Sequence, residues 1–486
     1  MGTRALHHAS ALQIAAAIRD GETSAAEMLE VFIDRTERLN PAINAVIATD
    51  HAAAREAAAG LDQLNRRGYR LGPFHGVPMT VKESYNLTGL QTTWGDTDYI
   101  GNIATADAVV VERIKRQGAV VFGKTNVPLM LADFQSYNAV YGTTHNPHRQ
   151  GHTPGGSSGG GAAALAAGFT ALEYGSDIGG SIRNPAHYSG VCGHKPTWGI
   201  VPMRGHALTG ALTPTDISVV GPLARSIDDL ELALELTAGS DRLHEPGWKL
   251  DLAPSEVEGA EGLRVALWCD DPIAAVDDSV QKVLRHAAEA LSEAGAIVDD
   301  QARPDFTPQH CMDTYRTLLF SAMAARQPQA QFEQSIRRLE GLAPDDMSDG
   351  AQVLRAQTIR HRDWATANEA RTRMRYAWAD FFEKYDVLLC PVASVPSFPH
   401  DESEDMNART LTVNGKTVSY FDQLFWAGMT GVSYLPGTVV PGGMTDGRLP
   451  VGIQVVGPEM GDRRTLAVAR VIESLTGGFQ APEGFD

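Results

Sequence analysis

Glycine is concentrated in two short stretches of this 486-residue chain, and these stretches constrain its fold more than any other feature. The first reads TPGGSSGGG over Thr153–Gly161, and the second reads GSDIGGSIR over Gly175–Arg183. Glycine lets the backbone adopt positive φ and leaves no side chain between amide N–H groups and a ligand. Between the stretches, apolar residues predict a short buried helix over Gly161–Gly168 and a buried strand over Phe169–Tyr174.

Two serines lie in these loops, Ser157 in the first and Ser181 in the second. A loop–helix–strand–loop path can fold back and bring both serines to one end of a sheet. A flexible linker is one alternative, but a linker would not enclose eight almost wholly apolar residues. A phosphate-binding loop is the other, but the chain has no Gly-x-x-x-x-Gly-Lys-[Ser/Thr] motif here. The pattern therefore favours a site where the backbone and the two serines meet a ligand.

The chain resembles the amidase signature hydrolases, and within them the stand-alone amidases. The motifs that carry the resemblance are GGSSGG at Gly155–Gly160, GSDIGGSIR at Gly175–Arg183, GHKPT at Gly193–Thr197 and GVPMTVK at Gly76–Lys82. Weaker similarity extends from about residue 11 to about residue 474. The resemblance implies an α/β amidase signature fold, with a large mixed β-sheet covered by helices on both faces. It also implies a single domain over 1–486, with N-terminal helices in 1–70, the signature core in 72–225 and a helical insertion in 308–384.

Periodicity predicts individual elements along the chain. Helices are expected at 10–20, from the Thr23-Ser24 cap to about Leu39 before Pro41, and at 50–66. A strand at 77–81 and a helix and strand at 107–117 and 119–123 indicate a βα repeat with parallel strands. Further strands and helices are expected at 263–268, 279–294, 296–298, 387–390, 449–457 and 465–475.

Composition excludes several function classes. A formal net charge of −18 argues against a non-specific nucleic-acid binder, which needs a basic face. No apolar run reaches the 18 residues of a membrane helix, and no secretory signal core is present. The cysteines are widely spaced and suit a reduced compartment better than a disulfide or zinc site: Cys192, Cys269, Cys311 and Cys390. We expect a cytoplasmic enzyme of small amides, without a membrane, nucleic-acid, metal or organic-cofactor requirement. The oligomeric state is open, and a homodimer is compatible with the sequence.

Lys82 is the candidate base. Most lysines are solvated surface cations, but Lys82 directly follows the apolar residues of a predicted strand. Desolvation lowers the pKa of a lysine towards values that suit a base. The resemblance implies the same role, since the family's catalytic lysine stands in this motif.

The resemblance implies acyl transfer to water through a Ser-Ser-Lys triad. Ser181 is expected to attack the amide carbonyl, while its proton passes through Ser157 to Lys82 and then to the leaving amine. Backbone N–H groups of the loop are expected to bind the oxyanion, each worth roughly 3–4 kcal/mol: Ile178, Gly179, Gly180 and Ser181. The resemblance further implies a cis peptide bond between Gly156 and Ser157.

A histidine base is the alternative chemistry, because histidine titrates near neutrality. Two of the fifteen histidines, His187 and His194, fall inside the signature segment, where we expect structural roles. A Ser-His-Asp triad is not excluded by the sequence, although the chain has no Gly-x-Ser-x-Gly elbow. Asp177 and Arg183 flank the nucleophile loop and are expected to pair and hold it.

Substrate choice is expected outside the signature core, in 129–137, 308–384 and 421–429. Apolar and aromatic side chains there predict a pocket for an aryl or medium-chain acyl group, with Leu131, Tyr137 and Trp426 as candidate substrate contacts. The alternative function is that of the glutaminase component of a tRNA-dependent amidotransferase complex, since that component shares the signature motifs. The segment TNVP at Thr125–Pro128 and the histidine of GHKPT look like the stand-alone group.

Overall fold

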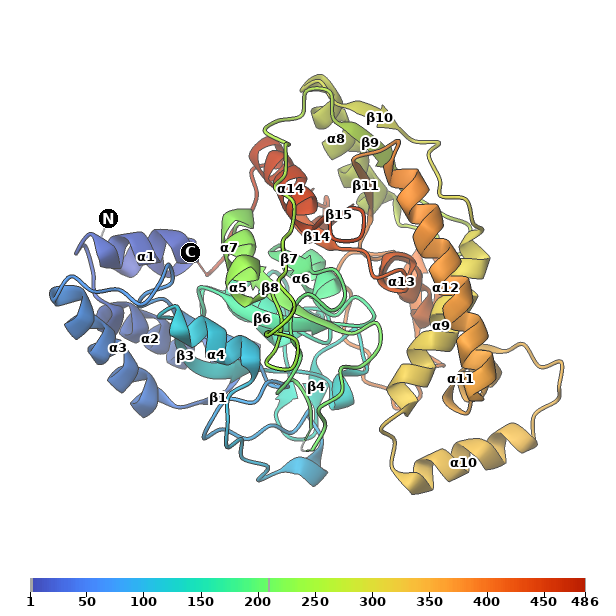
Figure 1. Cartoon of the computed structure of the whole chain (residues 1–486), viewed down its shortest axis with the longest axis horizontal. Helices are drawn as coiled ribbons and strands as arrows, with labels where there is room; N and C mark the ends of the chain where they lie inside the picture. The colour runs from blue at the N-terminus through green and yellow to red at the C-terminus, as the bar shows by residue number, and fades with distance from the viewer. Residues whose placement is uncertain (1–2, 209, 486) are drawn as a thin grey trace.

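The computed structural model describes residues 3–208 and 210–485, so the predicted domain limits at 1 and 486 lie outside the described residues (Figure 1). The N-terminal segment forms a 3-10 helix at Thr3–His8 and the helices α1 (Ala11–Arg19), α2 (Ala25–Ile43) and α3 (His51–Arg66). Ser10 and Ser24 close capping boxes at the starts of α1 and α2.

Helix α2 runs four residues further than predicted and passes through Pro41. Proline usually ends a helix because it lacks an N–H group and crowds the preceding turn. Here the last turn is held because Ile43 is buried and because Asn44, in the left-handed conformation, donates its N–H to the Asn40 carbonyl at 2.6 Å.

A small three-stranded sheet has the order β1-β3-β2 and holds β1 (Val46–Thr49), β2 (Pro78–Lys82) and β3 (Val120–Thr125). Helix α4 (Val109–Arg116) connects β2 to β3, and these two strands are parallel, as the sequence predicts. Strand β1 is antiparallel to β3. The predicted βα repeat therefore exists, but it forms a sheet separate from the large one.

The large sheet has eight strands in the order β10-β9-β11-β15-β14-β7-β8-β6. The pairs β10–β9 and β9–β11 are parallel and the remaining pairs are antiparallel, so the sheet is mixed as expected. Its strands are β6 (Glu173–Asp177), β7 (Cys192–Lys195), β8 (Val219–Ala224), β9 (Arg264–Leu267), β10 (Ile297–Asp299), β11 (Val387–Pro391), β14 (Gly437–Met444) and β15 (Pro450–Val456).

Helices cover both faces of this sheet. The short helices α5 (Gly159–Ala166) and α6 (Arg183–Ser189) pack together on one face. On the other face lie α7 (Ile227–Thr237), α8 (Asp278–Glu293) and α14 (Asp462–Thr476). None of the helices in the described part of the chain combines the length and the apolar character that a bilayer span requires.

The strand predicted over Phe169–Tyr174 is placed wrongly, because β6 begins only at Glu173. The residues before it turn towards β2 instead: the Thr80 N–H is shared between the Leu172 carbonyl and the Thr170 hydroxyl. These apolar residues are buried without a ladder of their own, and an apolar run of this length resembles a strand in the sequence.

The predicted insertion consists of four helices, α9 (Pro308–Ala324), α10 (Gln329–Glu340), α11 (Asp349–Gln357) and α12 (His361–Phe382), on the right in Figure 1. Helix α13 (Leu424–Gly431) packs against α9, and at this contact Tyr315 lies over Gly428. A Cβ at Gly428 would come within 2.1 Å of the Tyr315 ring, so only glycine fits. The minor elements are Thr97–Tyr99, Leu129–Leu131 and Tyr420–Gln423 (3-10 helices) and β4 (Tyr137–Asn138), β5 (Gly142–Thr143), β12 (Thr410–Val413) and β13 (Lys416–Ser419).

Candidate active site

Lys82 ends strand β2 and is completely buried. Its amine lies 2.7 Å from the Ser157 hydroxyl oxygen and 3.0 Å from the hydroxyl oxygens of both Ser158 and Ser176. The contacts come from three parts of the chain: β2, the loop before α5, and β6. All three contacts are hydroxyls, so the described residues give the amine no direct carboxylate partner.

The buried position changes the proton affinity of this amine. Burial lowers the pKa of Lys82 to about 7, although the negative charges of Asp177 and Glu173 act in the opposite direction. The ordinary pKa of a lysine is about 10.4. A large fraction of Lys82 is therefore a free amine at neutral pH, and a free amine can accept a proton.

The Gly156–Ser157 peptide bond is cis, as the resemblance implies. Gly156 lies against the backbone of the preceding segment: a Cβ here would stand 2.4 Å from the Asp133 carbonyl oxygen. Gly155 has φ of +94°, and a Cβ on it would meet Pro185 at 2.6 Å. The two glycines are therefore required by close contact, and they set where Ser157 enters the site.

Ser181 lies at the turn between β6 and α6 and is 7% exposed. Its carbonyl accepts a hydrogen bond of 3.1 Å from the Ser158 N–H, which ties the two glycine-rich loops together. The Ser181 hydroxyl makes no hydrogen bond to another described residue. The structure thus brings Ser157 into contact with Lys82 and fixes Ser181 beside them through the backbone.

The loop before Ser181 is organised by the Asp177 carboxylate. This carboxylate accepts the N–H groups of Gly180 at 2.9 Å and Ile182 at 3.0 Å, and Gly180 has φ of +104°. The Gly180 amide is therefore engaged and points to Asp177, which removes it from the predicted oxyanion set in this structure. The amides of Ile178, Gly179 and Ser181 make no hydrogen bond to other described residues, so they stay available.

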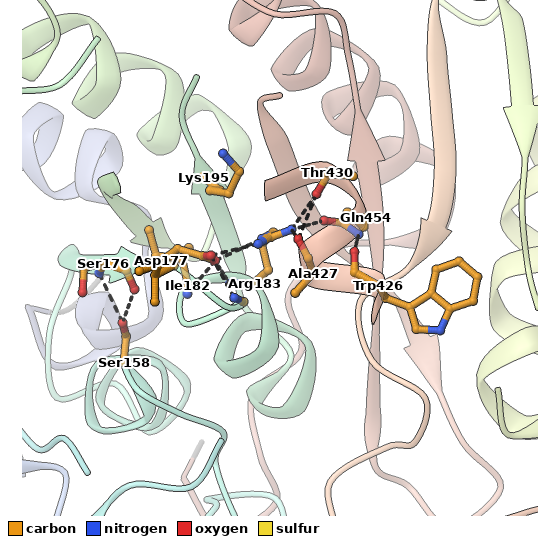
Figure 2. Close-up of polar contacts among 12 residues, drawn as sticks. Ser158, Ser176, Asp177, Ile182, Arg183, Lys195, Trp426, Ala427, Thr430 and Gln454 are labelled. Carbon is orange, nitrogen blue, oxygen red and sulfur yellow. Dashed lines mark hydrogen bonds and ion pairs between the residues drawn. The ribbon is translucent and has the colours of Figure 1, made fainter. Parts of the chain in front are cut away.

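Asp177 in turn pairs with Arg183, as Figure 2 shows. The Arg183 guanidinium donates to the two carboxylate oxygens at 2.8 and 3.0 Å, and both side chains are buried. Burial opposes ionisation of Asp177, but the adjacent guanidinium and the backbone donors hold its pKa well below the usual range.

The remaining N–H groups of Arg183 reach across to α13 and β15. They donate to the Ala427 carbonyl at 3.0 Å, the Thr430 hydroxyl at 2.8 Å and the Gln454 side-chain oxygen at 2.7 Å (Figure 2). The loop that carries Ser181 is thereby fastened to the rest of the large sheet.

The insertion also touches this loop. Tyr315 of α9 donates its hydroxyl to the Ile178 carbonyl at 2.9 Å. Sequence reasoning missed this contact, as it missed Ser158, Ser176 and Glu173. The two serines stand within the glycine-rich motifs and could have been named there, whereas nothing in the sequence connects Tyr315 to a loop 137 residues away.

Both histidines of the signature segment are structural in this arrangement. His187 accepts the Gly452 N–H at 2.9 Å and contacts the Val395 carbonyl at 3.1 Å, and its pKa is lowered to about 4 by burial. His194 contacts the Asp462 carboxylate at 3.1 Å.

The three predicted substrate contacts lie in different surroundings. Leu131 and Tyr137 are partly exposed, on the segment that borders Gly156, and the Tyr137 hydroxyl accepts from Arg409 at 2.6 Å. Trp426 is fully buried, and its indole N–H donates to the Ala274 carbonyl at 3.1 Å. In Figure 2 its ring points away from Arg183, so any effect of Trp426 on a ligand would pass through α13.

Comparison with known proteins agrees with this fold. The amidase family model matches residues 27–466. The indoleacetamide hydrolase of Bradyrhizobium diazoefficiens is 33% identical, over 96% of this chain and 86% of that protein. The acylamidase of Rhodococcus erythropolis is 32% identical, over 97% and 96% of the two chains. A crystal structure of a bacterial aryl acylamidase superposes with a TM-score of 0.82 at 24% identity, over 97% of each chain.

The chain belongs to the amidase signature family, and it is an amide hydrolase. The predicted fold is confirmed by the same likeness. The relatives also include the corresponding chains of glutamyl-tRNA(Gln) amidotransferases. The one from Salinispora tropica is 31% identical, over 97% of this chain and 98% of that protein.

Proposed function

We propose that this enzyme hydrolyses aryl or medium-chain acyl amides of small size through an acyl-enzyme on Ser181. The carrying observation is the 2.7 Å contact between the Lys82 amine and the Ser157 hydroxyl inside a fully buried compartment. A lysine placed there has no structural ion pair to make, and its lowered pKa suits a general base.

In the first half of the reaction, Ser181 Oγ forms a bond to the amide carbonyl carbon. Its proton moves to Ser157 Oγ while the Ser157 proton moves to the Lys82 amine. The carbonyl oxygen becomes an oxyanion, which the free amides of the 178–181 loop can bind. Collapse of the tetrahedral intermediate breaks the C–N bond, and the proton returns through Ser157 to the leaving amine or ammonia.

In the second half, water attacks the acyl carbon and gives a proton to the same Ser157–Lys82 path. The Ser181 ester bond breaks, Ser181 regains its proton and the carboxylic acid leaves. The same base therefore serves both halves, as microscopic reversibility requires for a single acid–base group.

Two observations favour an aryl or arylacetyl substrate. The names of two similar proteins are indoleacetamide hydrolase and acylamidase. The segment beside Gly156 presents Leu131, Phe134 and Tyr137, and apolar and aromatic walls are typical of small-molecule sites.

The test is expression of the chain alone, followed by measurement of ammonia or amine release from indole-3-acetamide, an anilide, hexanamide, malonamate and glutamine. We expect release from the aryl and medium-chain amides and little from malonamate. Ser181→Ala is the control, and retained activity in that variant would contradict the proposal.

The alternative is the glutaminase component of a tRNA-dependent amidotransferase complex, supported by the amidotransferase chains among the relatives. It would hydrolyse glutamine and pass ammonia to a partner. Glutamine as the preferred substrate in the same panel would favour this alternative.

A further inference from the structure

Glu173, the first residue of β6, places a carboxyl group directly behind the candidate base. One of its oxygens is bonded to the Thr80 hydroxyl and the other accepts from the Thr125 hydroxyl at 3.3 Å. Thr80 and Lys82 are two residues apart in β2, so their side chains leave the strand on the same face. Thr125 is the register partner of Lys82 in β3. The carboxyl group therefore binds both strands at the point where Lys82 stands.

This carboxyl group is fully buried and closely enclosed. Helix α5 presses on it: a Cβ at Gly161 would lie 2.6 Å from Glu173 Cγ. Its side-chain partners are neutral hydroxyls, in contrast to Asp177, whose charge is matched by Arg183. A buried carboxyl group without a cation is costly in its charged form, so its presence needs an explanation.

The titratable groups around Glu173 can be named element by element. Lys82 comes from β2 and is the cation whose charge acts on the carboxyl group. Asp177 on β6 is compensated by Arg183. Tyr85 and His206 also lie near the Lys82–Glu173 pair, and burial keeps Tyr85 protonated and His206 neutral through shifts of their pKa values. Lys82 and Glu173 are thus the two groups here that can exchange charge near neutrality.

Burial raises the pKa of Glu173 to about 8, and burial lowers that of Lys82 to about 7. Two groups with overlapping titrations in one compartment lose protons as a pair. The carboxylate form of Glu173 favours the ammonium form of Lys82, and the ammonium in turn favours the carboxylate.

We propose that Glu173 is a positioning residue of the active site, which sets the basicity of Lys82 by forming a carboxylate next to it as the amine takes up a proton. The inference rests on the proposed function, in which Lys82 receives the Ser181 proton. Without Glu173 the ammonium would be stabilised less, and Lys82 would be a weaker base with a lower proton affinity.

The test uses Glu173→Gln, which keeps the size and both hydroxyl contacts but cannot ionise. The readout is the second-order rate constant for labelling of Ser181 by a fluorophosphonate, followed by mass spectrometry across pH 5–9. This reaction forms a P–O bond to Ser181, releases fluoride and sends the serine proton to the base, so it needs no knowledge of the physiological amide.

We expect the midpoint of the pH profile to move to lower pH in Glu173→Gln, by about half a unit or more, with a slower plateau rate. The ratio of variant to wild-type rate should therefore rise as the pH falls. A role confined to packing would lower the rate by the same factor at every pH.

Glu83→Gln is the matched control, because Glu83 is also buried and follows Lys82 directly in the chain. Its carboxylate turns instead to the Thr93 hydroxyl at 2.8 Å and the Trp94 N–H at 2.9 Å, and its charge acts on Lys124. We expect its profile to keep the wild-type midpoint. Circular dichroism and thermal melts verify folding of both variants.

An unchanged or raised midpoint in folded Glu173→Gln would overturn the inference and leave the proposed function intact. A shift of equal size in Glu83→Gln would also overturn it, since the effect would then not belong to Glu173. If the wild-type enzyme were not labelled at Ser181, or Lys82→Ala were labelled at the wild-type rate, the proposed function would fail first and this inference with it.

Discussion

The Lys82 amine and the Ser157 hydroxyl oxygen lie 2.7 Å apart, although 75 residues separate them in the chain. Two separate sheets make this contact. Lys82 ends a strand of the small sheet, whereas Ser157 precedes the helix that covers the large sheet. Since the segment before β6 bonds to β2, the two sheets are held in one register at this point.

The first prediction concerns unequal losses of activity. Ser181→Ala and Lys82→Ala remove the attacking atom and the base, so each should reduce kcat/KM by at least about a thousandfold. Ser157→Ala should leave a small measurable activity, because water can replace a proton relay. Equal and mild losses in all three folded variants would contradict these roles.

The second prediction is the pH dependence. Only the free amine of Lys82 can accept the serine proton, so kcat/KM should be low in acid, rise as the pH passes through about 7 and stay high above it. The measured pKa belongs to the coupled unit of Lys82, Ser157 and Glu173. In Lys82→Arg the rise should disappear, since a guanidinium stays protonated over this range. A wild-type profile that is flat between pH 5 and 9 would argue against a lysine base.

The third prediction concerns the buried ion pair. Arg183→Met leaves the Asp177 carboxylate buried and uncompensated, so the free energy of unfolding should fall by about 3–5 kcal/mol. Urea denaturation measures this change. Arg19→Ala, which breaks an exposed pair with Asp20, is the control and should leave the denaturation midpoint near that of the wild type.

The fourth prediction concerns the contact between the insertion and the loop. Tyr315→Phe keeps the ring over Gly428 but removes the hydroxyl that donates to the Ile178 carbonyl. We expect kcat to fall by about tenfold, a loss of about 1.4 kcal/mol, with a melting temperature within a few degrees of the wild type. If kcat were unchanged, the hydroxyl would serve packing alone.

The fifth prediction separates the candidate pocket residues. Leu131→Ala should change relative kcat/KM among aryl and alkyl amides by roughly ten- to two-hundredfold, since it removes apolar surface beside Gly156. Trp426→Ala should instead destabilise the fold by about 3–5 kcal/mol, because the indole fills the core. A substrate panel and a melt on each variant distinguish the two, and an unchanged ranking in Leu131→Ala would place the specificity elsewhere.

Local patterns in the sequence are sufficient for much of the fold. Lys82 can be placed at the end of a strand because the apolar run before it has a strand's length, and the four insertion helices follow their periodicity. The motifs around Ser157 and Ser181 identify the loops that meet in the site. In each case the signal lies within a few residues of the position that it describes.

Other features depend on contacts that no local pattern carries. The start of β6 at Glu173 is decided by pairing of the preceding residues with β2. Gly180 is removed from the oxyanion set by the carboxylate of Asp177, whose direction is a three-dimensional fact. Trp426 resembles a pocket wall in the sequence because an aromatic residue in a helix can face either a core or a cavity, and burial decides which.

The complete burial of Lys82 has a consequence for the path of individual protons. Its amine touches three hydroxyl groups, so exchange with bulk solvent must pass through the same serines that face the substrate. While an amide is bound to Ser181, that route is occupied. In the mechanism proposed above, the hydrogen isotope lost by the nucleophile would be the one delivered to the departing nitrogen, retained inside the protein between bond formation and bond cleavage.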